Sequence, residues 1–219
     1  MPGAAAGCGH APTCVRCPRL VAVREQDRVR QSGWHAAPVA AVGPPDGRLL
    51  VVGLAPGRRG AHRTGRPFWG DDSGDWLHAA LLRHGFAEAA GTGRPPRLLD
   101  CRITNAVRCL PPGNRPTPAE RKQCAAYLFR DLGLLCRGGR RRRSVAILAL
   151  GRVAHDAILA VLGQPLSSMP FGHASLHDLG SRVYLVDSYH CSRYNTRTGR
   201  LTRPMFDLVF ERLKSCLVP

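Results

Sequence analysis

Four short apolar runs, each followed by a segment with helical spacing, constrain the fold of this chain more than any other feature. The runs cover residues 48–54, 98–107, 144–150 and 183–188. Uninterrupted apolar strands are typical of sheets that are buried on both faces. A short helix is predicted after Pro18, within residues 14–25. The helices that follow the runs are predicted between Asp71 and Gly85 and at about 118–135, 152–162 and 205–213. This alternation predicts an α/β fold with a four-stranded parallel sheet that is covered on both faces.

The order of these elements also predicts where a ligand binds. In parallel sheets with crossover helices, ligands bind beyond the carboxyl ends of the strands. The segments that follow those ends are 53–75, 104–114, 151–155 and 187–200. Functional residues are therefore sought in these four segments.

The charge balance indicates a polyanionic partner. Lys and Arg total 32 against 15 Asp and Glu, which gives a net charge of +17, and only two of the basic residues are lysines. Arginine binds phosphates in a bidentate manner, and basic side chains release counterions from nucleic acid. An arginine-rich proteome would give the same composition, and a membrane surface is a third interpretation.

Because the sequence has no run of eighteen apolar residues and no secretory signal, we expect a cytoplasmic protein that spans no membrane.

The chain has nine cysteines, at positions 8, 14, 17, 101, 109, 124, 136, 191 and 216. An odd number without a secretory signal argues against a disulfide framework. Cys14 and Cys17 form a CxxC before Pro18, and two thiolates at this spacing can bind one metal centre. Together with Cys109 and Cys124, they would make a four-thiolate site for Zn²⁺ or a [4Fe–4S] cluster. Ordinary packing is the simpler interpretation for Cys101, Cys136, Cys191 and Cys216.

The segment after the first strand reads GLAPGRRGAHRTGRPFWGDDSGDWL, residues 53–77. Its glycines permit close approach of the backbone to a ligand. Phe68 and Trp69 are suited to stacking on a base, and phosphates would be bound by Arg58, Arg59, Arg63 and Arg66. Asp71 stands at a helix start, where it either holds a water or a developing cation, or simply caps the helix. The pattern leaves both roles open.

The segment at the end of the last strand reads DSYHCSRYNTRTGRLT, residues 187–202. His190 lies where a catalytic group is expected in such a fold. The loop beyond it is polar and basic, and such a loop can enter a groove and contact phosphates. A single histidine is more often a packing residue, but this position favours a functional one.

These motifs resemble the uracil-DNA glycosylase superfamily, in particular its iron–sulfur families four and five, and family five more closely. The resemblance covers roughly residues 14–213 and rests on GLAPG (53–57), RTGRPF (63–68), GDDSG (70–74), AVRC (106–109), ALGR (149–152) and SYHCSRYNTRTGRLT (188–202). It implies a three-layer α/β/α sandwich around the parallel sheet. It also implies that uracil, and other deaminated bases such as hypoxanthine or xanthine, are removed from DNA to leave an abasic site.

The resemblance further assigns roles to particular residues. Asp71 matches the essential aspartate of the family, His190 its motif-end histidine and Phe68 its base-stacking phenylalanine. The substrate-binding turn matches Gly53, Leu54, Ala55, Pro56 and Gly57. The ligands of a structural [4Fe–4S] cluster match Cys14, Cys17, Cys109 and Cys124, and no metal is expected in catalysis.

Several positions depart from the family patterns. Leu54 stands where family four has Glu, as in family five. Asn105 resembles the uracil-reading Asn of family four, where family five often has Ala. The remaining departures are Arg58, Arg59 and His62, where family five usually has Ala, His and Asn, and Cys191, where Pro or Val is usual.

These observations predict a monofunctional DNA-repair glycosylase that flips the damaged base out of the DNA. Asp71 would stabilise the cationic sugar or position water, and His190 would bind the leaving base anion. DNA contacts are expected from Arg63, Arg66, Ser192, Asn195 and Arg197.

We expect a flexible tail at 1–13, one domain at 14–219, a nucleoid-associated monomer, and double-stranded or single-stranded DNA as partner. The rival interpretation is a non-catalytic, metal-stapled nucleic-acid-binding protein.

Overall fold

The computed structural model describes residues 13–139 and 143–217, so the predicted tail lies outside the described residues except for Thr13. The helices within this part are α1 (Pro18–Arg30), α2 (Ala61–Thr64), α3 (Asp72–Arg83), α4 (Pro118–Gly139), α5 (Arg152–Leu162), α6 (Arg193–Arg197) and α7 (Arg203–Cys216), with a 3₁₀ turn η1 (Pro112–Asn114). The strands are β1 (Leu49–Gly53), β2 (Ala87–Glu88), β3 (Arg97–Leu98), β4 (Cys101–Asn105), β5 (Val145–Leu150), β6 (Leu176–Asp178) and β7 (Val183–Ser188).

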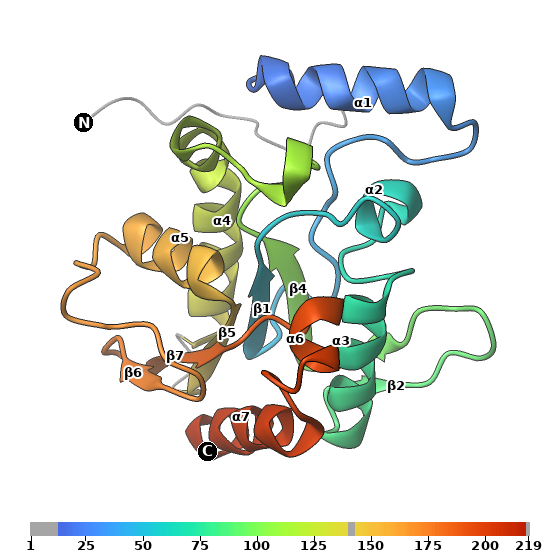
Figure 1. The fold of residues 1–219 in the computed structure, drawn as a ribbon. Coiled ribbons are helices and arrows are strands. Elements are labelled where there is room, and N and C mark those ends of the chain that lie inside the picture. Colours follow the sequence, from blue (N-terminus) through green and yellow to red (C-terminus); the bar gives the residue numbers. More distant parts are fainter. Residues whose placement is uncertain (1–12, 140–142, 218–219) are drawn as a thin grey trace.

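The central sheet has the strand order β4-β1-β5-β7-β6. The four predicted strands correspond to β1, β4, β5 and β7, and all of them pair in parallel. The expected count of four strands is one too few, because β6 adds an antiparallel edge strand beside β7. The four parallel strands end on the same side, where β1 and β4 lead toward α2 and η1 (Figure 1).

Two helical layers cover the sheet, as the apolar runs and the family resemblance predict (Figure 1). On one face, α3 and α7 pack against alternate strand residues through side chains such as Leu77, Leu81 and Phe210. On the other face, α4 and α5 pack through Leu128 and Ile158. Because every residue of β1 and β5 is buried, these strands read as continuous apolar runs. The architecture is the predicted α/β/α sandwich.

Local signals in the sequence explain where the helices begin and end. Thr117 and Glu120 form a capping box at the start of α4: Thr117 N donates to Glu120 Oε2 at 2.8 Å, and Glu120 N donates to Thr117 Oγ1 at 3.2 Å. The Asp71 side chain caps α3 by accepting a hydrogen bond from Gly74 N at 3.0 Å. Gly163, in the left-handed region, ends α5.

The structure differs from the sequence prediction at some boundaries. The strand predicted at 98–107 is split, because Leu98 belongs to a separate hairpin of β2 and β3 and the central strand starts only at Cys101. Both terminal helices are longer than predicted. Among the described residues, no helix is long and apolar enough to cross a membrane.

Candidate active site

A cavity of about 360 Å³ opens beyond the carboxyl ends of the four parallel strands. This size lies within the usual range of small-molecule sites, roughly 300–1,000 Å³. The cavity brings together most of the predicted catalytic and base-binding residues: Leu54, Ala55, Gly57, Phe68, Asp71, Asn105 and His190, with Ser192 at its edge. Gly53 and Pro56 are buried and do not line it.

The ring of Phe68 packs tightly over the end of β1. Gly53 pairs with Asn105 of β4, and a Cβ at Gly53 would come within 2.5 Å of the Phe68 ring and of Asn105 Oδ1. Only glycine therefore fits at position 53 without a shift. Phe68 has a φ of 51°, a left-handed conformation that is rare for a bulky residue. Such strain is often found at ligand sites, where the surroundings hold a side chain in place.

Asn105 provides an unpaired polar group at this cavity. The residue is only 2% exposed, and within the described part of the chain its Oδ1 accepts no hydrogen bond. A buried polar atom without a partner costs about 1–3 kcal/mol, so native structures contain few of them. The Asn105 amide is therefore positioned to bind the polar edge of a ligand.

Asp71 has two separate environments for its two carboxylate oxygens. Oδ1 accepts the α3 capping hydrogen bond from Gly74. Oδ2 lies against the loop backbone, since a Cβ would approach it to 2.7 Å at Gly57 and 2.1 Å at Gly60. Among the described residues, no protein donor bonds to Oδ2. The helix-cap role is thus observed, and it leaves the second oxygen available at the cavity.

His190 follows β7 and lies near Phe68, with ring centroids 6.0 Å apart and an interplanar angle of 32°. Burial lowers the pKa of His190 below its ordinary value of 6.5, while the Asp71 carboxylate opposes this effect. The imidazole is therefore neutral at neutral pH and carries one N–H donor and one acceptor.

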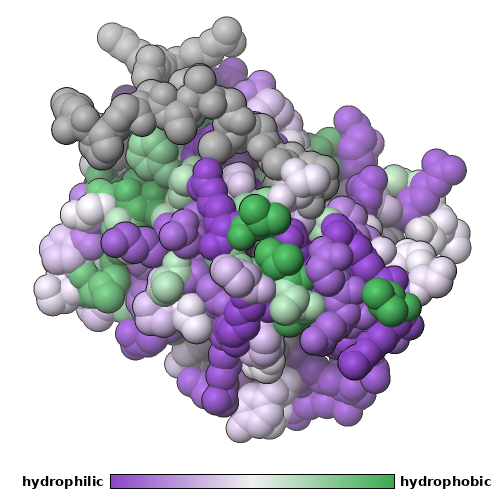
Figure 2. All heavy atoms as spheres, turned by 90° about the horizontal axis from the view of Figure 1, so that it is seen from above, coloured by the Kyte–Doolittle hydropathy of each residue, from purple (hydrophilic) through white to green (hydrophobic). Residues whose placement is uncertain are grey.

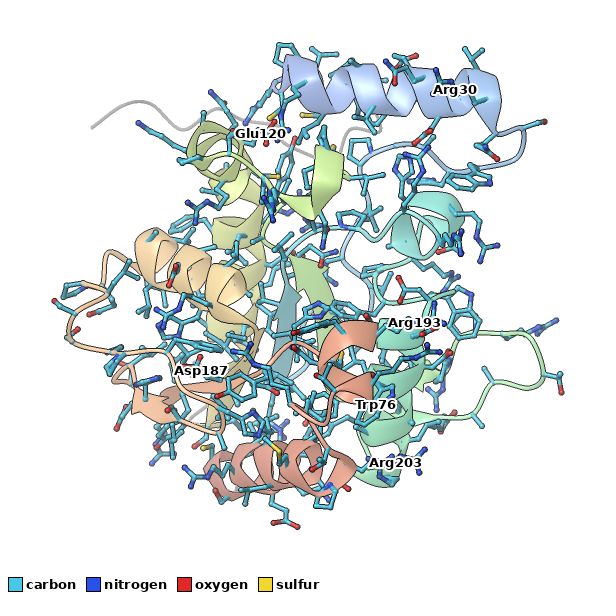
Figure 3. All side chains as sticks on the ribbon, viewed as in Figure 1. Arg30, Trp76, Glu120, Asp187, Arg193 and Arg203 are labelled. Atoms are coloured by element: carbon cyan, nitrogen blue, oxygen red, sulfur yellow. The ribbon has the colours of Figure 1, made fainter. Side chains whose placement is uncertain are left out.

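The loop after His190 is tied to its surroundings by short polar contacts. Asn195 Nδ2 donates to the His190 carbonyl oxygen at 2.8 Å, and Ser192 Oγ accepts from Asn195 N at 3.4 Å. Arg193 forms an ion pair with Asp72 at 3.2 Å, which joins α6 to the start of α3 (Figure 3). Cys191 is buried and donates to the Ser73 carbonyl at 3.3 Å. The amide of Asn195 therefore supports His190 within the protein.

The predicted DNA-contacting arginines do not line the cavity. Arg63, Arg66 and Arg197 are exposed and lie outside its lining. The face of the molecule seen from above in Figure 2 carries mostly hydrophilic side chains, with a few hydrophobic ones between them. Exposed arginines such as Arg63, Arg66 and Arg197 suit contacts with phosphates.

The structure also brings the four predicted metal ligands together. Cys14, Cys17, Cys109 and Cys124 line one small hollow between α1 and the chain around the start of α4. Their apolar neighbours are Leu20 and Val107. Burial raises the pKa of Cys109 to about 12 and that of Cys124 to about 11, so these thiols stay protonated unless a cation binds them.

Two buried arginines surround this cysteine site. Arg24 Nη1 lies 4.0 Å from Cys109 Sγ, and its Nε has no hydrogen-bond partner within the described residues. Arg108 is also buried, and its backbone N donates to Cys124 Sγ at 3.2 Å. Guanidinium groups beside four thiolates would offset the negative charge of a bound centre. The residues present therefore fit a four-thiolate metal group.

Helix α1 also contacts the loop of residues 57–62, whose glycines lie against Asp71 Oδ2. Asp27, which is 1% exposed, accepts hydrogen bonds from Arg58 and, at 3.0 Å, from His62 Nε2. Burial lowers the pKa of His62 despite this carboxylate. Arg58 and His62, both departures from the family pattern, thus fasten the 57–62 loop to the helix that follows Cys17.

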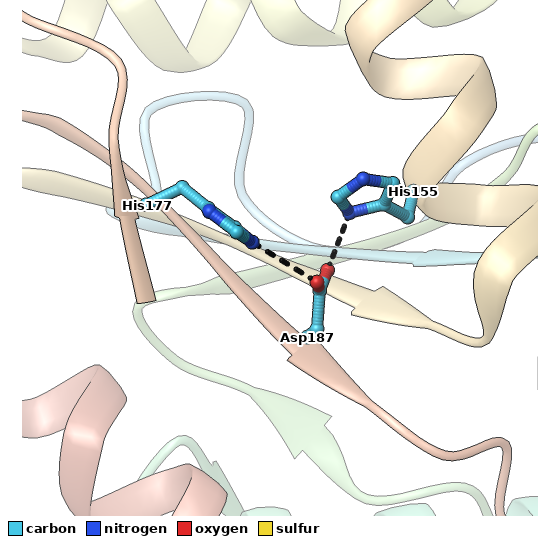
Figure 4. Close-up of side chains that lie close together, drawn as sticks. All are labelled: His155, His177 and Asp187. Carbon is cyan, nitrogen blue, oxygen red and sulfur yellow. Dashed lines mark hydrogen bonds and ion pairs between the residues drawn. The ribbon is translucent and has the colours of Figure 1, made fainter. Parts of the chain in front are cut away.

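A second histidine and aspartate cluster lies outside the cavity, between α5, β6 and β7 (Figure 4). Asp187 Oδ1 bonds to His155 Nδ1 at 2.8 Å, and Asp187 Oδ2 to His177 Nε2 at 3.2 Å. The other nitrogen of His155 bonds to the Met169 carbonyl at 2.9 Å. The polar atoms of this cluster are thus largely satisfied by each other and by the backbone.

Two polar residues with long or amide side chains, Arg152 and Asn114, also line the cavity although the sequence analysis gave them no role. Arg152, exposed at the start of α5, lines the cavity and stacks on Phe171 at 5.3 Å. Asn114 lines it from η1, with a φ of 57°. Both lie in segments predicted to matter, 151–155 and 104–114; Arg152 also ends the ALGR motif, but the sequence assigned no role to either residue.

Comparisons with known proteins identify the family of this chain. The sequence pattern of the uracil DNA glycosylase superfamily matches residues 40–214. A type-5 uracil-DNA glycosylase of Thermus thermophilus is 44% identical over 200 residues, covering 88% of this chain and 89% of that protein. One from Mycobacterium bovis is 43% identical over 214 residues, covering 92% and 77%. A type-4 uracil-DNA glycosylase of Archaeoglobus fulgidus is 30% identical over 175 residues, covering 77% and 78%. The chain therefore belongs to the uracil-DNA glycosylase superfamily.

Proposed function

We propose that this protein excises uracil from DNA by hydrolysing the bond between the base and its deoxyribose. The observation that carries the proposal is the single cavity that holds Phe68, Asn105, Asp71 and His190 together. A base inside the double helix cannot enter such a cavity, so the nucleotide must first be flipped out of the stack.

The two base-binding groups suit a flipped uracil. The Phe68 ring offers a face for stacking, and stacking on an aromatic ring suits any base. The Asn105 amide can donate and accept hydrogen bonds at the base edge, and its Oδ1 has no other partner in the described chain. We infer that this amide selects for uracil, while stacking and the backbone of 53–57 also admit hypoxanthine and xanthine.

The charges that develop in the reaction match the remaining two groups. As the glycosidic bond breaks, the sugar becomes cationic and the base becomes an anion. Asp71 Oδ2 would stabilise the sugar or orient the attacking water, whose oxygen bonds to the sugar carbon and whose released proton neutralises the charge of the departed base. The neutral His190 ring would donate its N–H to the base anion.

We further propose that Cys14, Cys17, Cys109 and Cys124 hold a structural [4Fe–4S] cluster. A single Zn²⁺ with bonds of about 2.3 Å would require sulfurs roughly 3.8 Å apart. Within the described residues, no three of these cysteines bring their sulfurs within 4.8 Å of one another, which favours a larger group. Such a group would supply a covalent staple between α1 and the start of α4, and no chemistry at the cavity.

The metal assignment is tested by the colour and composition of the purified protein. Protein prepared without oxygen should be brown and absorb broadly near about 400 nm, because thiolates transfer charge to iron. Cys14→Ala should lower stability more than it lowers release per folded molecule. A colourless protein with one equivalent of zinc would overturn the assignment.

The proposed partner is DNA, bound by a monomer at the nucleoid. The net charge of +17 and the exposed arginines support contacts that do not depend on sequence. If about five phosphates are contacted, log affinity should fall against log salt with a slope of roughly −4 to −5. A flat salt dependence would contradict phosphate binding.

The activity is tested by base release from a duplex with one uracil. We expect free uracil and an abasic strand, without cleavage of the DNA backbone. The rival interpretation, a non-catalytic binding protein, predicts tight binding with no release.

A further inference from the structure

A second groove, of about 620 Å³, is lined by the two chain neighbours of Phe68, Pro67 and Trp69. Trp69 and Arg66 line it from the turn that carries Phe68, and the facing wall comes from the loop between β2 and β3 with Arg94, Pro95 and Pro96. Phe68 and Trp69 are neighbours in sequence, yet Phe68 lines the active-site cavity and Trp69 lines this groove. Phe68 has a left-handed backbone conformation at the point where the two neighbouring side chains turn to different sites.

The chemistry of the groove matches a nucleotide. Its lining has arginines and no acidic side chain, and within the described residues neither Arg66 nor Arg94 forms an ion pair. Prolines and Trp69 give it an apolar wall, which favours stacking of a base. The groove therefore combines a stacking surface with cations for a phosphate.

A buried histidine, His78, adds a polar group to the lining of the groove. His78 is 7% exposed and packs edge-to-face with Trp69 at 5.8 Å. Neither of its ring nitrogens has a hydrogen-bond partner of ordinary geometry in the described chain. Burial lowers its pKa, although the Phe68 carbonyl opposes this, so the ring is neutral at neutral pH. A neutral imidazole can donate to or accept from a base edge.

We propose that this groove binds a second, unpaired nucleobase of the same DNA strand, next to the base held in the active-site cavity. Trp69 stacks on this base, and Arg66 and Arg94 contact its phosphates. In a duplex the neighbours of a flipped base stay stacked and paired, so only single-stranded DNA can fill both sites. The inference rests on the proposed function, because it takes DNA as the partner.

Tryptophan fluorescence provides a direct test. The chain has three tryptophans, so Trp34→Phe with Trp76→Phe leaves Trp69 as the only one. The probe is undamaged single-stranded oligodeoxyadenylate of about twelve nucleotides, a length within the usual range of such sites. We expect the probe to quench Trp69 emission, and a duplex of equal length to leave it nearly unchanged. Binding of the labelled probe without quenching would overturn the proposal.

Substitutions then test the energetics by anisotropy of the labelled probe. Trp69→Ala should weaken binding of the single strand about tenfold, and Trp69→Phe should restore most of it. Arg94→Ala should reduce the salt slope by about one, whereas Arg212→Ala, exposed on α7, should change it little. Equal losses on single-stranded and duplex DNA would overturn the proposal. If the protein released no uracil but Trp69 were still quenched, the proposed function would fail and the groove would stand.

Discussion

Two aspartates near the carboxyl ends of the strands lie close to histidines. Asp71 is close to His190, and Asp187 is bonded to His155 and His177. Asp187 is fully buried, and both of its oxygens accept hydrogen bonds from the protein. Asp71 is half-buried, uses one oxygen as a helix cap, and directs the other toward glycines at a cavity. The same residue types thus have different roles. The polar atoms of the Asp187 cluster bond to one another, whereas Asp71 keeps one oxygen available for a ligand.

The largest effect is expected at Asp71. Asp71→Asn keeps a capping oxygen but removes the charge, so release of every base should slow by about 10²-fold or more. Single-turnover rates on uracil and hypoxanthine duplexes at saturating enzyme measure this. Asp75→Asn, exposed on the same helix, is the matched control and should keep the wild-type rate. Near wild-type rates for Asp71→Asn would reduce this residue to a helix cap.

A loss of stability is expected at the other aspartate. Asp187→Asn removes a buried carboxylate that hydrogen-bonds to both His155 and His177, and loss of two such bonds costs about 3 kcal/mol. In a chain of this size, that lowers the melting temperature by about 10 °C. Asp178→Asn, on exposed β6, should change it little. If Asp187→Asn has the melting temperature of the wild type, the hydrogen bonds of Asp187 do not stabilise the fold.

A smaller and selective effect is expected at Asn105. Asn105→Ala removes the unpartnered amide from the cavity, so uracil release should fall about 30-fold, as loss of a buried hydrogen bond implies. Hypoxanthine release should fall less, because the larger pocket still holds a purine. Equal losses on both bases would show that Asn105 is structural.

The smallest effect is expected from the protonation of His190. Its pKa is lowered by burial, so below about pH 6.5 the unfolded chain takes up a proton before the folded one. Stability should therefore fall as the pH drops from 6.5 toward the folded pKa, by at most about 1.4 kcal/mol per pH unit. Melting curves at pH 7.5 and 5.5 should show a larger loss for the wild type than for His190→Gln. The same loss in both proteins would place the proton elsewhere.

The sequence predicted the parts of the fold that local pattern controls. The four buried strands were recognisable because both of their faces are covered, as in Val145–Leu150. The edge strand β6 was missed because it has only three residues and two of them are exposed. The helix predicted after Pro18 was not extended beyond residue 25, but α1 runs to Arg30, and Asp27 in this extension is held by Arg58 and His62, which are distant in sequence.

The same limit applies to the site. Asp71, Phe68 and His190 were predicted from motifs at strand ends, and the structure places them at one cavity. Phe68 and Trp69 were taken as one aromatic pair, since nothing in the sequence announces the left-handed turn that separates them. Arg152 and Asn114 lie in segments that were predicted to matter, but they were missed because the sequence does not show which side chains of those segments face the cavity.

The most direct test measures Asp71→Asn and Asp187→Asn side by side, for both uracil release and melting temperature. Asp71→Asn should lose about 10²-fold or more in single-turnover release and melt close to the wild type. Asp187→Asn should melt about 10 °C lower and release uracil at close to the wild-type rate per folded molecule. Uracil release by Asp71→Asn at the wild-type rate would contradict a catalytic role for the cavity carboxylate.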